Sequence, residues 1–109
     1  MNCIFCKIAN KEIKSSVVLE GKNVFAFDDI NPQAPVHVVV IPKAHIEDMT
    51  KLDGVLPEIF EAIAKVAGIK KVKEGGFRVV MNNGPDSGQA VPHLHFHVLG
   101  GRKLAWPPG

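Results

Sequence analysis

The sequence predicts a single α+β domain, in which one long helix packs on one face of an antiparallel sheet. Its 109 residues are enough for one domain, spanning residues 1–109, and leave no room for a second. The patterns along the chain predict three strands, one long helix and then two strands, with short connections between neighbouring strands. Short connections favour antiparallel pairing, because a parallel pair needs a crossover of a dozen or more residues.

The first half of the chain contains a helical turn and three strands. Ile4–Ala9 is short and apolar, which predicts one helical turn. Val17–Glu20 and Val24–Phe27 are apolar and β-branched, and the Gly-Lys-Asn between them predicts a hairpin. Asn31–Pro35 holds two prolines and is expected to be a loop. His37–Ile41 is almost entirely Val and Ile, which indicates a central strand.

The second half of the chain contains the long helix and the last two strands. Apolar residues recur at three- and four-residue spacing over Val55–Lys73, as on the buried face of a helix, and Gly68 weakens the end of that segment. Phe77–Asn82 and Val91–Leu99 read as strands, and Asn83–Gly88 between them is a turn-rich loop.

Charge and composition exclude several classes of protein. The 13 basic and 11 acidic residues give a net charge of +2, which is too weak to indicate a nucleic-acid or membrane surface. The longest apolar stretch, Val38–Ile41, is far shorter than the roughly 20 residues of a membrane helix. The N-terminus lacks the basic and apolar regions of a signal peptide, so a cytoplasmic location is expected.

Three histidines alternate with apolar residues at His93, His95 and His97. On a strand this spacing places three imidazoles on one face and leaves the apolar residues to pack on the long helix. A core would not favour three neighbouring rings that repel one another when protonated. Two functional interpretations remain: a metal site, or nucleophilic attack by a neutral imidazole on phosphorus or an acyl carbon.

The loop before these histidines is rich in glycine and amide side chains over Asn82–Ala90. Such a loop can bind an anion through its backbone N–H groups. Alone this is weak evidence, because Gly and Asn usually mark turns. Followed so closely by three aligned histidines, the loop suggests a phosphate held beside a nucleophile.

Several segments together match the pattern of one family. His93–Leu99 matches the signature His-φ-His-φ-His-φ-φ, in which φ is apolar, and further matches lie at Asp29–Pro35, Ile41–His45, Gly88–Gln89, Gly100–Arg102 and the Trp106–Gly109 tail. The chain therefore resembles the histidine triad (HIT) superfamily over nearly its whole length. Within that superfamily it is similar to the Hint branch, the purine nucleoside phosphoramidases.

The resemblance implies both a structure and a reaction. The implied fold is a five-stranded antiparallel sheet with one long and one short helix, assembled as a two-fold homodimer through the long helix and the last strands. The implied substrate is AMP bonded through phosphorus to an amine or an acyl group. It would be cleaved through a covalent adenylyl-histidine to give AMP, and the chemistry needs no cofactor.

The resemblance also implies roles for individual residues. His95 would be the nucleophile, His97 would hydrogen-bond the phosphate or the leaving group, and His37 would belong to a supporting relay. The expected substrate-binding residues are Asp29 with Ile30 at the ribose, Asn82, Gly88, Gln89 and Ala90 at the phosphate, and Ile4, Phe5, Ile8, Phe27 and Val39 around the purine. Core packing is the alternative for these apolar residues, and a satisfied core histidine is the alternative for His37.

Two residues depart from the Hint pattern. Ala90 stands where many Hint proteins carry a serine whose hydroxyl reaches the phosphate, and Pro92 stands where an aromatic residue is common. At position 90 the chain can offer only a backbone N–H. Both departures concern the rate and the preferred leaving group, and neither concerns the nucleophile.

The Cys3-x-x-Cys6 motif has three interpretations: two buried thiols, a redox pair or part of a zinc site. Some HIT members and the related galactose-phosphate uridylyltransferases combine such a motif with a histidine after the third strand and the first histidine of the triad. That resemblance favours a closed structural zinc site at Cys3, Cys6, His45 and His93. Two cysteines alone do not form the disulfide framework of a small secreted domain.

Three alternative functions remain open from the sequence. A non-catalytic purine nucleotide-binding module is supported by Ala90. A dinucleoside polyphosphate hydrolase is the neighbouring HIT activity, but the Trp106–Gly109 end resembles the Hint branch. A metalloenzyme that uses all three triad histidines would leave the anion-binding loop unused, and its strand carries no Asp or Glu.

Overall fold

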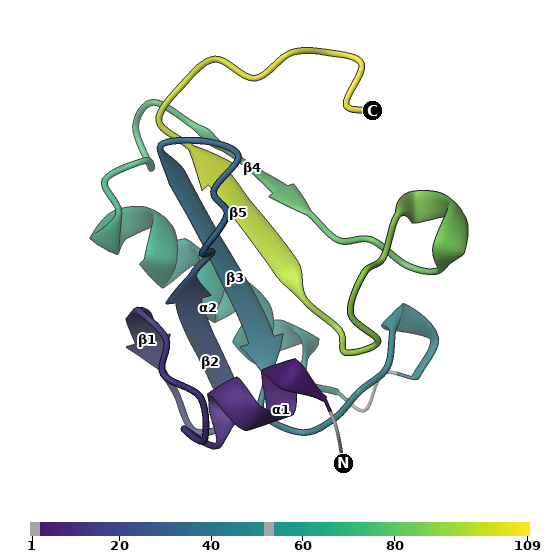
Figure 1. Cartoon of the computed structure of the whole chain (residues 1–109). Coiled ribbons are helices and arrows are strands. Elements are labelled where there is room, and N and C mark those ends of the chain that lie inside the picture. Colours follow the sequence, from purple (N-terminus) through teal and green to yellow (C-terminus); the bar gives the residue numbers. More distant parts are fainter. Residues whose placement is uncertain (1–2, 52–53) are drawn as a thin grey trace.

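One antiparallel sheet of five strands, in the order β1-β2-β3-β5-β4, organises the computed structural model, which describes residues 3–51 and 54–109. The strands are β1 (Val17–Glu20), β2 (Val24–Asp28), β3 (Val36–Pro42), β4 (Phe77–Val80) and β5 (Phe96–Gly100). The helices are α1 (Ile4–Ala9) and α2 (Leu56–Ile69), and short 3₁₀ turns lie at Met49–Lys51 and Pro85–Ser87. The predicted α+β fold is confirmed, with α1 and α2 on opposite faces of the sheet (Figure 1).

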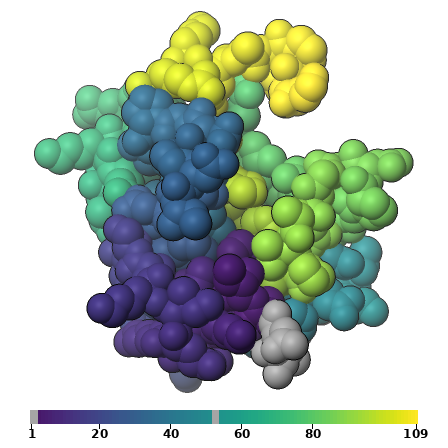
Figure 2. All heavy atoms as spheres, viewed as in Figure 1, coloured from purple at the N-terminus to yellow at the C-terminus, as the bar shows by residue number. Residues whose placement is uncertain are grey.

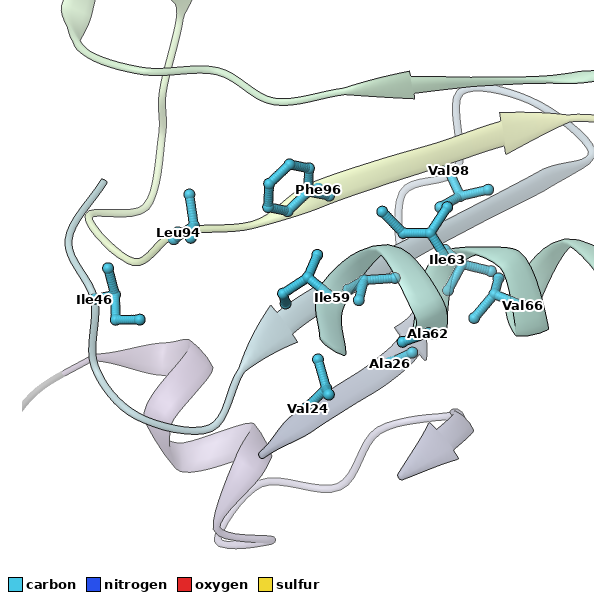
Figure 3. Close-up of a cluster of buried hydrophobic side chains, with 12 residues drawn as sticks. Val24, Ala26, Ile46, Ile59, Ala62, Ile63, Val66, Leu94, Phe96 and Val98 are labelled. Carbon is cyan, nitrogen blue, oxygen red and sulfur yellow. The ribbon is translucent and has the colours of Figure 1, made fainter. Parts of the chain in front are cut away.

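Alternation along the strands builds a core on each face. Val24 and Ala26 of β2, and Phe96 and Val98 of β5, face the buried stripe of α2 in the larger cluster (Figure 3). The residues between them on β2 and β3 form a smaller cluster with α1, which contains Ile8, Ala9, Phe25, Phe27, Val39 and Ile41. This second cluster takes its strand residues from β2 and β3 only. It therefore does not cover the part of the same face that β5 and β4 form.

The long helix is shorter than predicted. It ends at Ile69 rather than at Lys73, directly after Gly68, the residue expected to weaken it. Lys71, just beyond the helix, has a positive φ of 59°, in the left-handed region that commonly follows a helix end. Among the described residues, no helix is long and apolar enough to cross a membrane.

The last strand begins later than predicted. β5 starts at Phe96 instead of Val91, because the backbone N–H groups of His93 and Leu94 donate to the carbonyls of Val91 and Ile46, and not to β3. Consequently only His97 of the three triad histidines lies within the sheet ladder, opposite Val39 of β3 and Val80 of β4. β4 is correspondingly short and ends at Val80 rather than at Asn82.

Candidate functional site

Four of the five histidines belong to two clusters, and the fifth, His95, lies beside both. The Cys–His cluster contains Cys3, Cys6, His45 and His93, and the relay cluster contains Asp29, His37 and His97. Within each cluster the nitrogen, sulfur or oxygen atoms that could bind a metal lie within 4.8 Å of one another. His95 follows His93 by two residues, and its ring centroid lies 5.0 Å from that of His97.

His95 is buried, and one backbone contact determines which of its nitrogens is reactive. Its Nδ1 lies 2.7 Å from the carbonyl oxygen of His93. A carbonyl only accepts hydrogen bonds, so in the neutral ring the proton is on Nδ1 and Nε2 keeps its lone pair. Phe5 of α1 packs edge-on against this ring, with the two centroids 5.0 Å apart. His95 is therefore held in the tautomer that a nucleophile attacking through Nε2 requires.

The relay cluster is also ordered by a backbone group. The N–H of Gln33 donates to Nδ1 of His37, which places the proton of neutral His37 on Nε2. That Nε2 lies 2.8 Å from Nδ1 of His97 and 3.4 Å from a carboxylate oxygen of Asp29. His97 thus accepts through Nδ1 and carries its own proton on Nε2. In this arrangement His97 can donate a hydrogen bond to an anion while remaining uncharged.

Burial keeps the relay histidines neutral. Burial, together with smaller effects of the neighbouring His95 and His37, lowers the pKa of His97 to about 4, whereas Asp29 acts in the opposite direction. Burial also lowers the pKa of His37, again against the effect of Asp29. Both rings are consequently uncharged at neutral pH, as the alternating donor and acceptor pattern requires.

The glycine-rich loop is held in shape by the side chain of Gln89. Its Oε1 accepts from the N–H of Gly84, and its Nε2 donates to the carbonyls of Glu47 and Val91. Gln89 is expected at the phosphate, and in the structure its amide holds the loop closed. Asn82 is half-buried, Gly88 and Ala90 are exposed, and Gly88 has a φ of +86° that favours glycine.

The residues expected around the nucleoside differ in how much surface they offer. Ile8, Phe27 and Val39 are buried in the cluster under α1, so core packing accounts for them. Ile4 and Ile30 are exposed, and Phe5 is half-buried against both His95 and Phe27. Asp29 keeps a partly exposed carboxylate, one oxygen of which accepts from the N–H of Asn31.

The Cys–His cluster has the spacing of a tetrahedral metal site. Nδ1 of His93 lies 3.3 Å from Sγ of Cys3 and 3.6 Å from Sγ of Cys6, and Nδ1 of His45 lies 3.3 Å from Sγ of Cys6. With Zn–S near 2.3 Å and Zn–N near 2.0 Å, neighbouring ligand atoms of a tetrahedral zinc site lie about 3.5 Å apart. Two thiolates and two imidazoles are also a donor set that zinc favours.

His93 belongs to this cluster by its orientation. The ring is fully buried, and its Nε2 lies 2.8 Å from the carbonyl oxygen of Pro42, to which it donates. Its Nδ1 lone pair therefore points to the cysteines, as expected of a metal-binding histidine oriented by a backbone carbonyl. The sequence could not reveal the three backbone groups that orient these rings, the carbonyls of Pro42 and His93 and the N–H of Gln33, because every residue carries such groups.

Comparison with known proteins places this arrangement in a family. A family model described as "HIT domain" matches residues 10–104. The chain is 47% identical to a "14 kDa zinc-binding protein" of Zea mays, an alignment that covers 97% of this chain and 87% of that protein. It is 43% identical to "Adenylylsulfatase HINT1" of Arabidopsis thaliana, over 97% of this chain and 76% of that protein.

A solved structure agrees with the sequence matches. The crystal structure of a HIT family hydrolase from Legionella pneumophila Philadelphia 1 superposes with a TM-score of 0.95 at 46% identity. The match covers 99% of this chain and all of that one. The family match, the Hint-like relative and the shared architecture confirm the resemblance found in the sequence. This chain belongs to the HIT domain family.

Proposed function

We propose that this protein hydrolyses purine nucleoside phosphoramidates or acyl-adenylates to AMP through a covalent adenylyl group on His95. One observation carries the proposal: the hydrogen bond from His95 Nδ1 to the His93 carbonyl, which leaves Nε2 unprotonated beside a neutral His97. Relatives described as a HIT family hydrolase and as an adenylylsulfatase support hydrolysis at an adenylyl group.

The first half of the proposed reaction forms the covalent intermediate. His95 Nε2 attacks phosphorus, a P–N bond to His95 forms, and the bond from phosphorus to the leaving amine or carboxylate breaks. A leaving amine takes one proton from solvent. The positive charge that develops on the His95 ring is stabilised by the His93 carbonyl at Nδ1. His97 would donate its Nε2 proton as a hydrogen bond to a phosphoryl oxygen, an electrostatic contribution typical of such transfers.

The second half returns the enzyme to its starting state. Water attacks phosphorus, the P–N bond to His95 breaks, AMP leaves and the attacking water releases one proton. The proton taken from solvent in the first half is thereby returned. His37 would hold His97 in its donor tautomer throughout, and Gln33 would in turn hold His37.

The nucleoside would lie on the side of the site formed by α1 and the end of β2. Asp29 would accept hydrogen bonds from the ribose hydroxyls, with Ile30 beside it. Among the apolar residues expected around the purine, Ile4 and Phe5 have surface to offer a base, and Ile30 at the ribose is exposed as well. The loop over Asn82, Gly88 and Ala90 would present polar groups to the phosphate.

Zinc in the Cys–His cluster is proposed as a structural ion. Cys3, Cys6, His45 and His93 would fill all four tetrahedral positions, so the ion would hold the N-terminal helix against the rest of the fold and take no part in catalysis. The relative named as a zinc-binding protein supports this assignment. Cysteine ligands of this kind suit a reducing compartment, consistent with the cytoplasmic location that we propose.

A homodimer through α2 and β4 is part of the same proposal. β4 is an edge strand, and Phe77 and Val79 on its α2 side are exposed apolar residues. Phe60 of α2 is also exposed, at 5.8 Å from Phe96 between ring centroids. An unpaired edge beside an apolar surface is what a second copy of the chain would cover.

Replacement of the nucleophile tests the reaction. The His95→Ala variant should lose hydrolysis of an adenosine phosphoramidate by more than about 1000-fold, the scale on which removal of a nucleophile acts. Lys65→Ala, on the exposed surface of α2, serves as the control and should retain wild-type turnover. Circular dichroism establishes that both variants are folded. Retained hydrolysis by a folded His95→Ala variant would refute the proposal.

The second candidate is a purine nucleotide-binding module without physiological turnover. Ala90 favours it, because the chain lacks a hydroxyl at the position where many Hint proteins have serine. Micromolar affinity for AMP, together with no phosphoramidate hydrolysis at high protein concentration, would select this function over the first.

A further inference from the structure

The Cys–His cluster and the proposed nucleoside site share one short segment of the chain. Ile4 and Phe5 are the two residues between Cys3 and Cys6 in the Cys-x-x-Cys motif. They are also the residues of the proposed purine wall that keep surface for a base, because Ile4 is exposed and Phe5 is half-buried. Figure 2 shows α1 (dark purple) at the surface of the molecule, beside the glycine-rich loop (green). This segment would therefore bind the metal through its cysteines and the base through the residues between them.

The two ends of α1 are anchored differently. Ile8 and Ala9, in its last turn, are buried in the cluster formed with β2 and β3. At the other end Cys3 occupies the N-cap position, and its side chain makes no capping hydrogen bond. A helix of six residues is not stable alone in water, so its first turn depends on what it contacts. That turn contacts the residues after β3 and before β5 through both cysteines and through the ring of Phe5.

The ring of Phe5 contacts both a proposed metal ligand and the proposed nucleophile. Its centroid lies 5.9 Å from that of His93 and 5.0 Å from that of His95, and it is edge-on to both rings. It also packs edge-on against Phe27, with 5.7 Å between the centroids. Because Phe5 and Cys6 are adjacent in α1, a displacement of the helix at Cys6 also displaces the ring that borders His95.

A metal ion would change how firmly the first turn of α1 is held. The thiol groups of cysteine are weak hydrogen-bond donors and acceptors, so without an ion they connect α1 weakly to His45 and His93. A zinc ion bound by the four residues of the cluster would replace these contacts with coordinate bonds. Ordering a backbone segment costs conformational entropy. Once one ligand has ordered the first turn of α1, a second ligand binds to a segment that is already in place.

We propose that zinc in the Cys–His cluster and a purine nucleotide bind cooperatively, with α1 as the element that they share. Zinc raises the affinity for the nucleotide, and by thermodynamic linkage the nucleotide raises the affinity for zinc by the same factor. The coupling acts through the base, because Ile4 and Phe5 are assigned to the purine and not to the phosphate. The ion stays outside the chemistry. This inference rests on the proposed nucleotide site, but it does not require turnover.

Two ligands that differ by the base test the coupling. We compare calorimetric affinities of the zinc-loaded and the zinc-depleted protein for AMP and for ribose 5-phosphate, which lacks the purine. Without zinc, AMP should bind about fivefold or more weakly, from the lower end of the range for coupled sites upward, and added zinc should restore the affinity. The affinity for ribose 5-phosphate should not change. Circular dichroism establishes that the zinc-depleted protein is folded.

Two variants show whether α1 carries the coupling. Phe5→Ala removes the ring that contacts His93 and His95, so the ratio of its AMP affinities with and without zinc should fall toward one. Lys65→Ala, on the exposed surface of α2, should keep the wild-type ratio. Three results would overturn the inference: an AMP affinity that does not depend on zinc, equal weakening of both ligands on zinc removal, or an unchanged ratio in Phe5→Ala.

The reciprocal measurement starts from the folded, zinc-loaded protein and does not require a folded zinc-free state. Zinc affinity is measured by competition with a chromophoric chelator, alone and with AMP or ribose 5-phosphate at equal saturation of the protein. AMP should strengthen zinc binding about fivefold or more, and ribose 5-phosphate should leave it unchanged. Equal effects of the two ligands on zinc affinity would contradict a coupling through the base.

Failure of the proposed function is recognised separately. Cooperative binding of zinc and AMP without hydrolysis of an adenosine phosphoramidate would rule out the phosphoramidase and leave the coupling standing. Hydrolysis together with an AMP affinity that does not depend on zinc would do the reverse. No detectable binding of AMP to the zinc-loaded protein would rule out both.

Discussion

The proposed chemistry depends on which nitrogen of each imidazole carries the proton. The carbonyls of His93 and Pro42 accept from His95 and His93, respectively, and the N–H of Gln33 donates to His37. Backbone groups thus assign a separate role to each ring: a nucleophile, a metal ligand and a relay member. Alternation along the chain groups the triad histidines but cannot distinguish these roles.

The relay predicts a loss of stability in acid. His97 has a folded-state pKa of about 4, below its ordinary value near 6.5. The unfolded chain therefore takes up a proton between those values while the folded chain does not. The free energy of unfolding should decrease as pH falls from about 6.5 to about 4, with a slope of at most about 1.4 kcal/mol per pH unit from this group.

Urea titrations of the wild-type protein and of His97→Gln at several pH values measure this effect. The variant keeps a polar side chain but cannot titrate, so its stability should decrease less over the same interval. The groups that face His97 are His95, His37 and Asp29, and all remain in the variant. Parallel pH profiles for the two proteins would contradict the assignment of a neutral His97.

At the scale of elements, the sequence predicted the interior of each strand better than its ends. Alternation correctly placed Leu94, Phe96 and Val98 toward α2. It placed the start of β5 too early, because the N–H of Leu94 donates to Ile46, a contact made only in the folded chain. The amide of Gln89 illustrates the same limit: it could serve a ligand or the loop, and only the fold reveals that it closes the loop.

The Cys–His cluster connects the short helix α1 to the histidine segment, in addition to the packing of Phe5 on His95. Cys3 precedes α1 and Cys6 lies within it, whereas His45 follows β3 and His93 precedes β5. The Cys-x-x-Cys spacing suggested metal binding, but the resemblance was needed to name the two histidines. The structure brings all four residues together.

Metal analysis tests this connection. Protein purified without chelator should contain about one zinc per chain, and Cys6→Ser should reduce the content below about half an equivalent and lower the melting temperature. His37→Gln removes a histidine from the relay cluster and is expected to retain zinc. Substoichiometric zinc in the wild-type protein that is unaffected by Cys6→Ser would exclude the proposed site.

At the scale of the whole molecule, the sheet has two edges of different character. β1 forms one edge, and β4 forms the other beside the exposed apolar residues Phe60, Phe77 and Val79. Arg78 and Val80 lie on the opposite face of β4, the face that His97 shares. A dimer through α2 and β4 would thus use the face that the chemistry does not.

A charge placed on each edge in turn tests the dimer. Val79→Lys on β4 should convert a dimer into a monomer, because it places an unpaired charge in an apolar interface. Val17→Lys on β1 makes the same substitution at an exposed position on the other edge and should leave the dimer intact. Sedimentation equilibrium measures both masses. A monomeric wild-type protein, or a dimer unaffected by Val79→Lys, would contradict the predicted interface.

In the reaction that we propose, His95 carries the adenylyl group during turnover. Intact-protein mass spectrometry tests it most directly, on samples quenched in alkaline denaturant within the first turnovers, because P–N bonds are labile in acid. We expect a mass increase of one adenylyl group per chain, located by peptide mapping at His95 and absent from His95→Ala. Turnover without an adduct, or an adduct on any other residue, would contradict it.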